Sequence, residues 1–518
     1  MALPLALAFG VASGAGAIAG LYGAIAVGFF AAIFGGTNSQ VSGPTGPMTV
    51  VMAVIVTEHA GNLGEAFAIV FLGGVFQVLL GSLRIGRFIS YTPYSVVSGF
   101  MSGIGIIIIV IQTLPFIGMG TVSGGPMGAI QAWPAAIQHI NLHALAIACL
   151  SLTIAIFWPH RLRSLLPSPL AALIFGTLAA LFLLPEAPVI GSVPSGFPQL
   201  YIPSFTLGQI PQIVQPALIL ALLGSIDSLL TSLVADSITR SRHNSNRELI
   251  GQGIGNMVAG LIGGLPGAGA TMRTVINVRA GGRSPVSGAL HSVILLALVL
   301  GLGPIAETIP HAALAGILMK VGWDIIDWGY LKRIRRAPRD KLVVMLVTLL
   351  LTVFVDLITA VGAGLILAGF VTARWMEQEE LKGVTSFALP QGDGALAEAE
   401  REALKDSNGR IGIIALRGHF SYASARELVQ RIGAAASGHE AVIFDFSGAA
   451  HVDTSAALAI EELFETVEAE TRGYFVAGLS GQAEETLRAL GAFEKTPPGR
   501  IVPTRLDAIK GAIDLIDS

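Results

Sequence analysis

Residues 263–280 read GGLPGAGATMRTVINVRA, and residues 43–57 read GPTGPMTVVMAVIVT. Each stretch opens with glycine and proline and continues as an apolar helical pattern that is too short to cross a bilayer, which needs about 20 residues. Irregular backbone at membrane depth is tolerated only where it is buried in protein or lines a cavity. A matched pair of such segments indicates the binding site of a membrane transporter. The alternative is that both are ordinary kinks.

The composition around these stretches is that of a membrane protein joined to a soluble domain. Of the 518 residues, 53% are hydrophobic and 13% are charged, whereas a soluble domain carries roughly 25% charged residues. Residues 1–384 hold 33 charged residues with a net charge of +5, and residues 385–518 hold 32 with a net charge of −8. Neither part is strongly basic, which disfavours a nucleic-acid partner. The single cysteine, Cys149, excludes an intrachain disulfide and a cysteine cluster for zinc.

Apolar segments recur fourteen times in the membrane part. They lie at residues 1–13, 17–35, 45–57, 65–82, 93–115, 142–158, 168–184, 213–235, 249–264, 271–280, 286–303, 312–329, 342–355 and 358–375. Basic residues such as Arg84, Arg161 and Arg240 follow every second segment, and the positive-inside rule assigns such loops to the cytoplasm. The two short stretches are the third and tenth segments, so each is third in a half of seven. We therefore expect an α-helical polytopic protein of the inner (plasma) membrane, built as two inverted repeats of seven with half-helices at segments 3 and 10.

The starts of the two half-helices are suited to an anion. Unpaired N–H groups and the helix dipole give each N-terminus about half a positive charge, and such ends bind small anions through the backbone. Thr45 lies at the start of the first half-helix, and Ala270 and Thr271 lie at the start of the second. Arg273, in the first turn of the second, adds a full charge. The alternative for Arg273 is a side chain that reaches water or pairs structurally with a carboxylate.

The eighth segment contains a carboxylate in the middle of an apolar helix, in ALLGSIDSLLTSLVAD at 221–236. Asp227 and Thr231 share one helical face, and a carboxylate at this depth normally has a partner or a function. Together with the carbonyls beside Gly269 they predict an all-oxygen site for sodium, or for a proton on Asp227. The alternative is a buried ion pair with Arg273. The summed charge of the empty site is about +1, which favours symport of a monoanion such as bicarbonate and does not exclude sulfate.

The chain resembles the sulfate permease (SulP) family of anion transporters along nearly its whole length. The similar stretches are LPLALAFGVASGAGAIAGLYGA, SGPTGPMTVV, GSIDSLLTSLVADSITRSRHNSNRELIGQGIGN, GGLPGAGATMRTVINVRAGG and IPHAALAGIL. Within the family it is most similar to the sodium-dependent bicarbonate transporters of cyanobacteria. The resemblance implies a core and a gate domain, a homodimer and a C-terminal STAS domain. Family members also carry a cytoplasmic lead and a complete first helix, so we expect the true N-terminus to lie upstream.

The resemblance also assigns roles to residues and an activity to the chain. The positions that match the family's sodium site are Asp227, Thr231, Gly269 and Thr271. The positions that match its anion site are Thr45, Ala270 and, near the anion, Arg273. The expected activity is import of an inorganic anion, first of all sodium-dependent bicarbonate symport, with sodium as the coupling ion. Proton-coupled symport of sulfate or a dicarboxylate is the second interpretation, a membrane-anchored regulatory protein is the third, and an enzyme is not expected because no nucleophile–base or metal pattern occurs.

Residues 411–518 alternate strand and helix patterns, including IGIIAL, AVIFDFSG and TSAALAIEELFETVEAE. This alternation predicts an α/β domain and matches a cytoplasmic STAS domain, preceded by the transport domain at 1–376 and a polar linker and domain entry at 377–410. Ser455 matches a serine that is phosphorylated in bacterial anti-sigma-factor antagonists, which this domain resembles, so a cytoplasmic regulator is an expected partner. The alternative is that Ser455 belongs to a helix N-cap.

Overall fold

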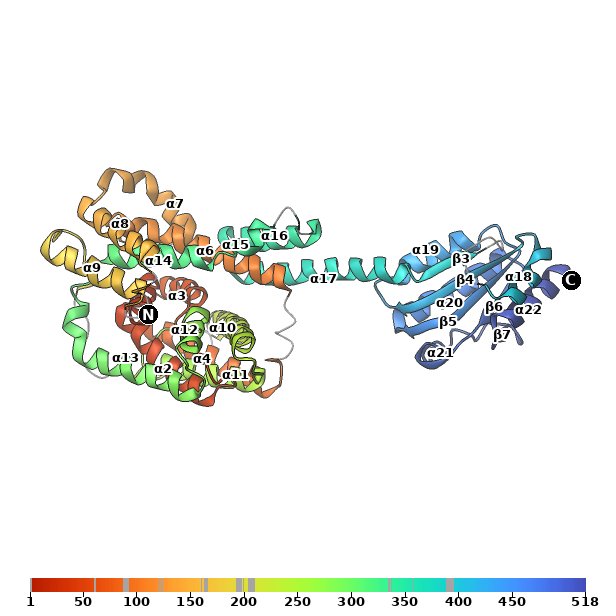
Figure 1. Ribbon diagram of the computed structural model, residues 1–518, viewed down its shortest axis with the longest axis horizontal. Coiled ribbons are helices and arrows are strands. Elements are labelled where there is room, and N and C mark those ends of the chain that lie inside the picture. Colours follow the sequence, from red (N-terminus) through yellow and green to blue (C-terminus); the bar gives the residue numbers. More distant parts are fainter. Residues whose placement is uncertain are drawn as a thin grey trace. The chain divides into compact units, whose positions relative to one another are not determined.

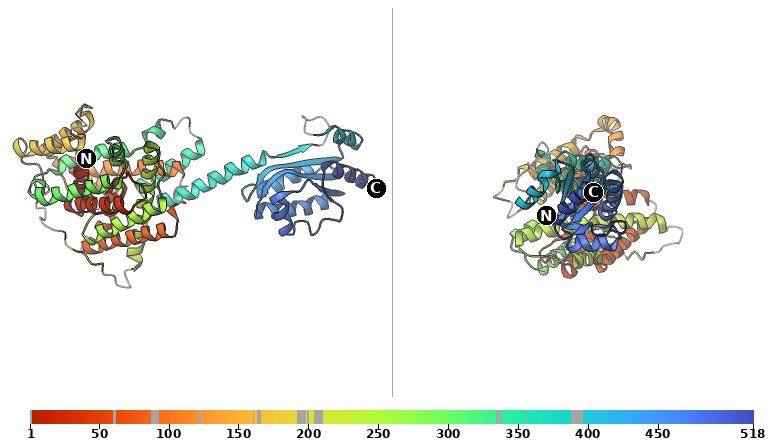
Figure 2. Two further views of the ribbon diagram at one scale, coloured as in Figure 1. Left: turned by 60° about the horizontal axis from the view of Figure 1, so that its bottom comes forward. Right: turned by 90° about the vertical axis from the view of Figure 1, so that its right-hand side faces the viewer.

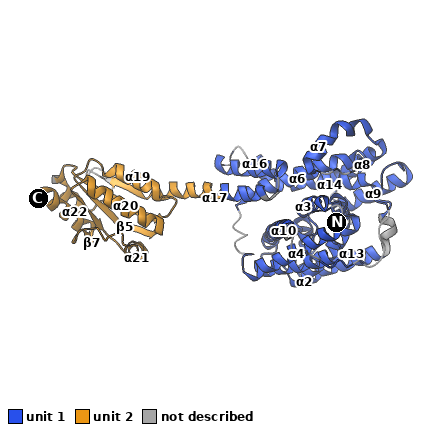
Figure 3. Cartoon of the chain, turned by 180° about the vertical axis from the view of Figure 1, so that it is seen from behind, with its two compact units in different colours: residues 1–368 blue, residues 369–518 orange. Residues whose placement is uncertain are grey.

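The computed structural model divides the chain into two compact units, residues 1–368 and residues 369–518 (Figure 3). It describes residues 2–59, 62–86, 93–120, 122, 124–159, 161–162, 166–191, 198, 200–203, 210–333, 336, 338–355, 357–387 and 396–518. The helix α17 (Leu357–Leu381) contributes residues to both units.

Unit 1 is helical in its described part, and each of the fourteen predicted segments coincides with a helix. These helices are α1 (Ala2–Ala12), α2 (Ala17–Phe34), α3 (Gly46–Glu58), α4 (Leu63–Ser82), α6 (Tyr94–Phe116), α8 (Leu142–Phe157), α9 (Ser168–Phe182), α10 (Ile210–Thr239), α11 (Ser245–Leu261), α12 (Thr271–Arg279), α13 (Pro285–Ala306), α14 (His311–Ile325), α16 (Arg339–Phe354) and α17. Two further helices, α7 (Gly125–Ala136) and α15 (Trp328–Lys332), were not predicted. Both are too short to give a span, and α7 contains Pro134.

Five helices in the described residues are long and apolar enough to cross a membrane: Ala17–Phe34, Leu63–Ser82, Tyr94–Phe116, Pro211–Thr239 and Thr359–Leu381. A sixth span arises if Gly125–His139 and Leu142–Phe157, which meet at 119°, count as one broken helix. Other apolar helices, such as α1, α3 and α9, are shorter. The prediction of a helical, multi-pass membrane protein is confirmed, while the arrangement in two inverted repeats stays a prediction.

The helices of unit 1 pack in two groups (Figure 1). In the first group, α2 and α4 pack against α11, α13 packs against α2, and α10 packs against α4 and α12. In the second group, α6 packs against α14 and α16, and α8 packs against α9 and α14. From the first group, α1 reaches α14 and α3 reaches α6. These contacts form the boundary between the two groups.

Glycine brings helices of the first group into close contact. A Cβ atom added at Gly20 of α2 would lie 1.8 Å from the carbonyl oxygen of Ala6 in α1. One added at Gly74 of α4 would lie 2.6 Å from the carbonyl oxygen of Gly253 in α11. Small residues allow backbones to approach this closely. Within a bilayer the lipid is as apolar as the side chains, so van der Waals contact, and not the hydrophobic effect, drives helices together.

Two short strands connect the two shortest predicted segments. β1 (Ser42–Gly43) precedes α3, and β2 (Ala268–Gly269) precedes α12. They pair antiparallel, with Ser42 opposite Gly269 and Gly43 opposite Ala268. The N–H group of Ala270 also donates to the carbonyl oxygen of Val41 at 2.9 Å. Main-chain hydrogen bonds therefore tie the segment before α3 to the segment before α12.

Unit 2 is a five-stranded sheet with helices on both faces (Figures 1 and 2). The strand order is β3 (Val384–Phe387), β4 (Ile411–Phe420), β5 (Ala441–Val452), β6 (Gly473–Ala477) and β7 (Ile501–Val502), with β3 antiparallel to β4 and the others parallel. One core includes Phe444 and residues of α19 (Ala425–Ala436), α20 (Thr454–Glu470) and α21 (Gly481–Ala489). A second core includes Ile443 and residues of α18 (Glu398–Leu404) and α22 (Arg505–Asp517). The prediction of a C-terminal α/β domain is confirmed.

The stretch 377–410, expected to be a linker and domain entry, supplies ordered elements to unit 2. It contains the end of α17, β3 and α18, while residues 388–395 lie outside the described residues. The N–H group and the Oγ atom of Ser421 donate to the Glu380 carboxylate at 3.0 and 2.8 Å. The last turn of α17 therefore packs on the rest of unit 2, which begins at Gly369.

An arginine cluster joins α22 to the sheet of unit 2. Arg505 donates to both carboxylate oxygens of Glu400 in α18 at 2.9 and 2.6 Å, and to Asp445 in β5 at 3.0 Å. Burial raises the pKa of Glu400. The hydrogen bonds from Arg505 and from the Ala397 N–H group together lower it by more, so the pKa lies below its usual value. The stabilisation from Glu400 is therefore complete above its unfolded pKa and is lost as the pH falls through the lowered, folded pKa.

Replacing Arg505 by methionine is expected to lower the free energy of opening of unit 2 by about 3 kcal/mol, because two largely buried carboxylates then face each other without a cation. Hydrogen exchange of peptides from β5 and α22 in the full-length protein measures this change. The control is Arg488→Met, which removes an exposed ion pair with Glu484 that contributes at most about 1 kcal/mol. Equal loss of protection in the two variants would contradict the role given to Arg505.

Candidate functional site

Thr45 and Ala270 are the N-cap residues of α3 and α12. Each cap carbonyl accepts the first helical hydrogen bond, from the N–H groups of Thr49 and Thr274, both at 2.9 Å. Neither cap side chain bonds to its helix, and the buried Oγ1 atom of Thr45 has no hydrogen-bond partner among the described residues. The first N–H groups of a helix have no partner within that helix. Two N-termini with this property lie at the ends of the β1–β2 pair.

Three of the four residues expected to bind a cation meet through hydrogen bonds. The Thr231 hydroxyl, on α10, donates to the carbonyl oxygen of Gly269 at 2.9 Å and lies 2.7 Å from the Thr271 hydroxyl oxygen. The Gly269 N–H group donates to the Ser228 hydroxyl at 3.0 Å. The structure thus gathers a carbonyl and two hydroxyl oxygens at the start of α12, where they form an all-oxygen group.

The fourth residue, Asp227, lies one helical turn before Thr231 on α10. It is 6% exposed, and its Oδ2 atom has no hydrogen-bond partner in the part of the chain that the structure describes. Asp227 is near enough to Thr45 and Arg273 to interact with both, but a carboxylate oxygen buried without a hydrogen bond is still costly. The donor set of carboxylate, hydroxyl and carbonyl oxygens is the set that hard cations prefer. The residues present therefore fit a sodium ion.

Arg273 faces the backbone that precedes α3. It is 6% exposed, and its Nη2 atom donates to the carbonyl oxygen of Pro44 at 2.5 Å. A Cβ atom added at Gly43, whose φ is +149°, would lie 2.7 Å from Nη1, so glycine leaves the room that the guanidinium occupies. The ion pairs within 4.0 Å among the described residues do not include Arg273 with Asp227. The buried ion pair weighed as an alternative is therefore not formed in this structure, and Arg273 connects the two half-helix segments.

A buried glutamate that was not predicted from the sequence connects the helices next to the site. Glu248 of α11 is 1% exposed. Its Oε2 atom accepts from the Gly36 N–H group at 2.9 Å, and its Oε1 atom accepts from the Nε2 atoms of Gln40 at 2.8 Å and Gln252 at 2.9 Å. The Oε1 atom of Gln40 accepts from the Ser232 hydroxyl at 3.0 Å. Glu248 thus links α11 through Gln40 to α10.

Gln40 lies directly against the glycine of the oxygen group. A Cβ atom added at Gly269 would lie 2.4 Å from the Gln40 Nε2 atom. The position of the Gly269 carbonyl therefore depends on Gln40, and the position of Gln40 depends on Glu248. The spacing of Glu248, Gln252 and Asn256 in the sequence places polar side chains every four residues on one face of α11.

Ser455 lies on the surface at the second position of α20. The N-cap is Asp453, whose Oδ1 atom accepts from the Ala456 N–H group at 2.8 Å and whose Oδ2 atom accepts from the Tyr422 N–H group at 2.7 Å. Ser455 is exposed. The capping role considered for this loop therefore falls to Asp453, and the Ser455 hydroxyl faces solvent.

Two family descriptions match the chain. The sulfate permease family matches residues 1–348, and the STAS domain matches residues 402–508. A curated relative named bicarbonate transporter BicA, from Picosynechococcus sp., is 41% identical over 524 aligned residues, which cover 99% of this chain and 92% of the relative. A putative sulfate transporter, YvdB of Bacillus subtilis, is 29% identical over 96% of this chain and 92% of its own length.

Solved structures agree with these matches. The transmembrane domain of a cyanobacterial bicarbonate transporter BicA is 48% identical, with a TM-score of 0.66, and the alignment covers 70% of this chain and 94% of that structure. The overall structure of SLC26A9 has a TM-score of 0.82 over all of this chain and 88% of its own, at 18% identity. The latter likeness concerns the fold alone.

Proposed function

Because the chain belongs to the sulfate permease family of anion transporters and carries a STAS domain, we propose that it imports bicarbonate by symport with sodium. It is a multi-pass membrane transporter and not an enzyme. The observation that carries the proposal is the oxygen group of Thr231, Gly269 and Thr271 at the start of α12, one helical turn along α10 from the buried carboxylate of Asp227. The near full-length similarity to proteins named bicarbonate transporters supports the choice of cargo.

The anion is proposed to bind between the N-termini of α3 and α12. Thr45 offers its hydroxyl, and Ala270 caps α12 with only a methyl side chain beside the first N–H groups of that helix. The partial positive charges of two helix N-termini favour an anion. Arg273 adds a full positive charge. Its guanidinium also donates to the Pro44 carbonyl oxygen and so fixes the backbone before α3.

Sodium is proposed to bind next to the anion, at Asp227, Thr231, Gly269 and Thr271. With two helix ends contributing about one positive charge, Arg273 contributing one and Asp227 subtracting one, the empty site carries about +1. A monovalent anion neutralises this charge and sodium restores it, so each ion favours binding of the other. Mutual stabilisation of this kind is what couples the anion to the sodium gradient.

Transport is proposed to move the first helix group, which holds both half-helices, relative to the second. This assigns the first group, with α1–α4 and α10–α13, to the core and the second group to the gate, in two inverted repeats of seven. The protein is proposed to act as a homodimer in the inner membrane, with residues 1–376 as transport domain and the STAS domain, residues 411–518, in the cytoplasm. Ser455 is then a solvent-facing position open to a kinase and to a cytoplasmic regulator.

Uptake of labelled bicarbonate into proteoliposomes tests the proposal. With an inward sodium gradient we expect uptake well above that with choline in place of sodium. Equal uptake in the two conditions would overturn sodium symport. The second candidate is proton-coupled symport of sulfate or a dicarboxylate, which the similarity to putative sulfate transporters favours. Labelled sulfate that enters with a proton gradient, and competes with bicarbonate, would support that candidate instead.

Replacing Thr231 by valine is expected to raise the sodium concentration for half-maximal uptake about tenfold, because the variant keeps the volume but loses one oxygen and one hydrogen bond of the group. The uptake rate as a function of sodium concentration measures this. The control is Thr239→Val on the same helix, where the hydroxyl bonds to the Ala235 carbonyl away from the site. A Thr231→Val variant with the same sodium dependence as the control would speak against a ligand role.

A further inference from the structure

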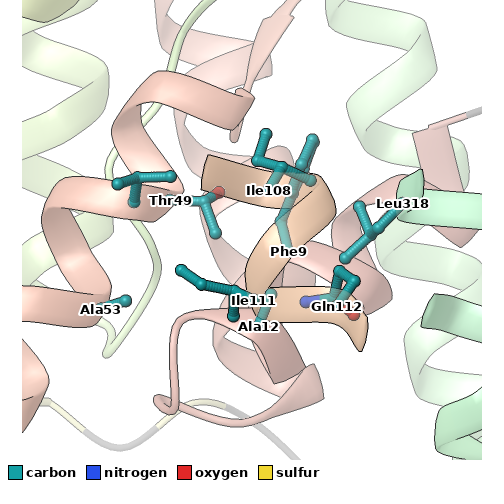
Figure 4. Close-up of a pocket in the computed structure, with 9 residues that line it drawn as sticks. Phe9, Ala12, Thr49, Ala53, Ile108, Ile111, Gln112 and Leu318 are labelled. Atoms are coloured by element: carbon teal, nitrogen blue, oxygen red, sulfur yellow. The ribbon is translucent and has the colours of Figure 1, made fainter. Parts of the chain in front are cut away.

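A pocket lies between the two helix groups, next to the proposed anion site (Figure 4). Its walls come from α1, α3, α6 and α14, and they include Thr49, Ala53, Ile108, Gln112 and Leu318. The pocket has a volume of about 20 Å³, which is room for roughly one water molecule. Apart from Thr49 and Gln112, the lining side chains are apolar.

Gln112 is the unusual member of this lining. It is 4% exposed, and its side-chain amide makes no hydrogen bond to another described residue. By contrast, the buried glutamines Gln40 and Gln252 both donate to Glu248. The Thr49 hydroxyl is also engaged, because it donates to the carbonyl oxygen of Thr45 at 2.7 Å. Gln112 therefore offers an amide that a group entering the pocket can bind.

The position of the pocket relates it to the anion route. Thr49 and Ala53 follow Thr45 by one and two turns on the same face of α3, so the pocket begins about 6 Å along the helix from the proposed anion site. Arg84 at the end of α4 marks the cytoplasmic side, so the end of α3 lies on the opposite side of the membrane. Gln112, in the last turns of α6, is near that same side.

We propose that this pocket is the closed outer part of the anion route and that Gln112 is a specificity-determining residue, whose amide N–H group donates to the anion in transit. The inference rests on the proposed function. An amide carries no charge, so it binds an anion weakly enough for release. The apolar side chains of the pocket pack the two helix groups together when no anion passes. Opening of the route separates α6 and α14 from α1 and α3.

Thiol accessibility tests the location. Cys149, the only cysteine of the chain, is exposed and is first replaced by alanine. In that background Gln112→Cys, in proteoliposomes, is expected to react with a membrane-impermeant methanethiosulfonate added from the outer side. The rate is expected to change at least about threefold when sodium and bicarbonate are added, because the ions shift the population of open states. The control is Leu114→Cys, a fully buried position two residues on, which stays unmodified. A cysteine at 112 that reacts only from the inner side, or under no condition, overturns the proposal.

Kinetics test the role in binding. Gln112→Leu keeps the size but removes the hydrogen bond, so we expect KM for bicarbonate to rise about fivefold to tenfold with an unchanged sodium dependence. Gln112→Asn keeps the amide and is expected to lie between the leucine variant and the wild type. Gln112→Glu places a negative charge in the route and is expected to lose most uptake. A leucine variant with wild-type KM overturns the proposal. If the wild type itself shows no bicarbonate uptake, the proposed function fails, and the thiol experiment still decides whether the pocket opens to the outer side.

Discussion

The Asp227→Asn variant is expected to lose sodium-driven bicarbonate uptake while it remains folded. Asparagine has the shape of aspartate, so the packing of α10 is preserved, but the negative charge and one anionic oxygen are removed. An interaction with a charged group contributes roughly 1.5–3 kcal/mol, so the apparent affinity for sodium is expected to fall about 100-fold. Uptake at increasing sodium concentration, up to levels that saturate the wild type, measures the loss.

The matched control for this variant is Asp236→Asn, on the same helix. Asp236 bonds to the backbone and the ring of His243, beyond the oxygen group. Its replacement is expected to leave the sodium dependence unchanged. Undiminished sodium-driven uptake by Asp227→Asn would remove Asp227 from the coupling site. A second outcome would support the proton-coupled alternative. In it, a proton gradient drives uptake by the wild type but not by Asp227→Asn.

The Glu248→Ala variant is expected to have the largest effect on stability. It removes the acceptor from three donors at once, the Gly36 N–H group and the amides of Gln40 and Gln252. Breaking a buried, charge-assisted network of this kind costs about 3–5 kcal/mol. We therefore expect a clearly lower unfolding temperature in detergent and poor recovery of folded protein.

The controls for Glu248 separate its charge from its packing. Glu58→Ala removes an exposed carboxylate at the end of α3 and is expected to change the unfolding temperature little. Glu248→Gln keeps one acceptor oxygen but turns an N–H group toward other donors, so its stability is expected to lie between those of the alanine variant and the wild type. An alanine variant as stable as Glu58→Ala would show that the network contributes little.

Much of the fold could be predicted because the relevant signals are local. Runs of apolar residues locate the helices, and the glycines and prolines at 43–47 and 263–267 mark where two of them break. α7 escaped prediction because a twelve-residue helix with an internal proline resembles a loop. β3 escaped prediction because its pairing with β4 depends on residues that follow it in the chain and not on its own four residues.

The sequence predicts candidate residues for the site, of which the structure brings Thr231, Gly269 and Thr271 together, but it does not predict their geometry. The positions of Asp227 and Thr231, four apart on one helix, could be read directly. The orientation of Arg273 toward Pro44 could not be read from the sequence. A buried arginine can equally well face a bound anion or pair with a carboxylate side chain. The part played by Glu248 required knowledge that residues 36–40 fold against α11, a contact between segments about two hundred positions apart.

The pairing of β1 with β2 has a consequence for the diversity of such proteins. If the anion binds to peptide groups at the starts of α3 and α12, as proposed, its binding site is insensitive to most side-chain replacements, since every residue except proline brings the same N–H group. A preference for a singly or a doubly charged anion would then depend on the few charged side chains nearby, such as Arg273. The same backbone arrangement could in that case serve anions of different charge.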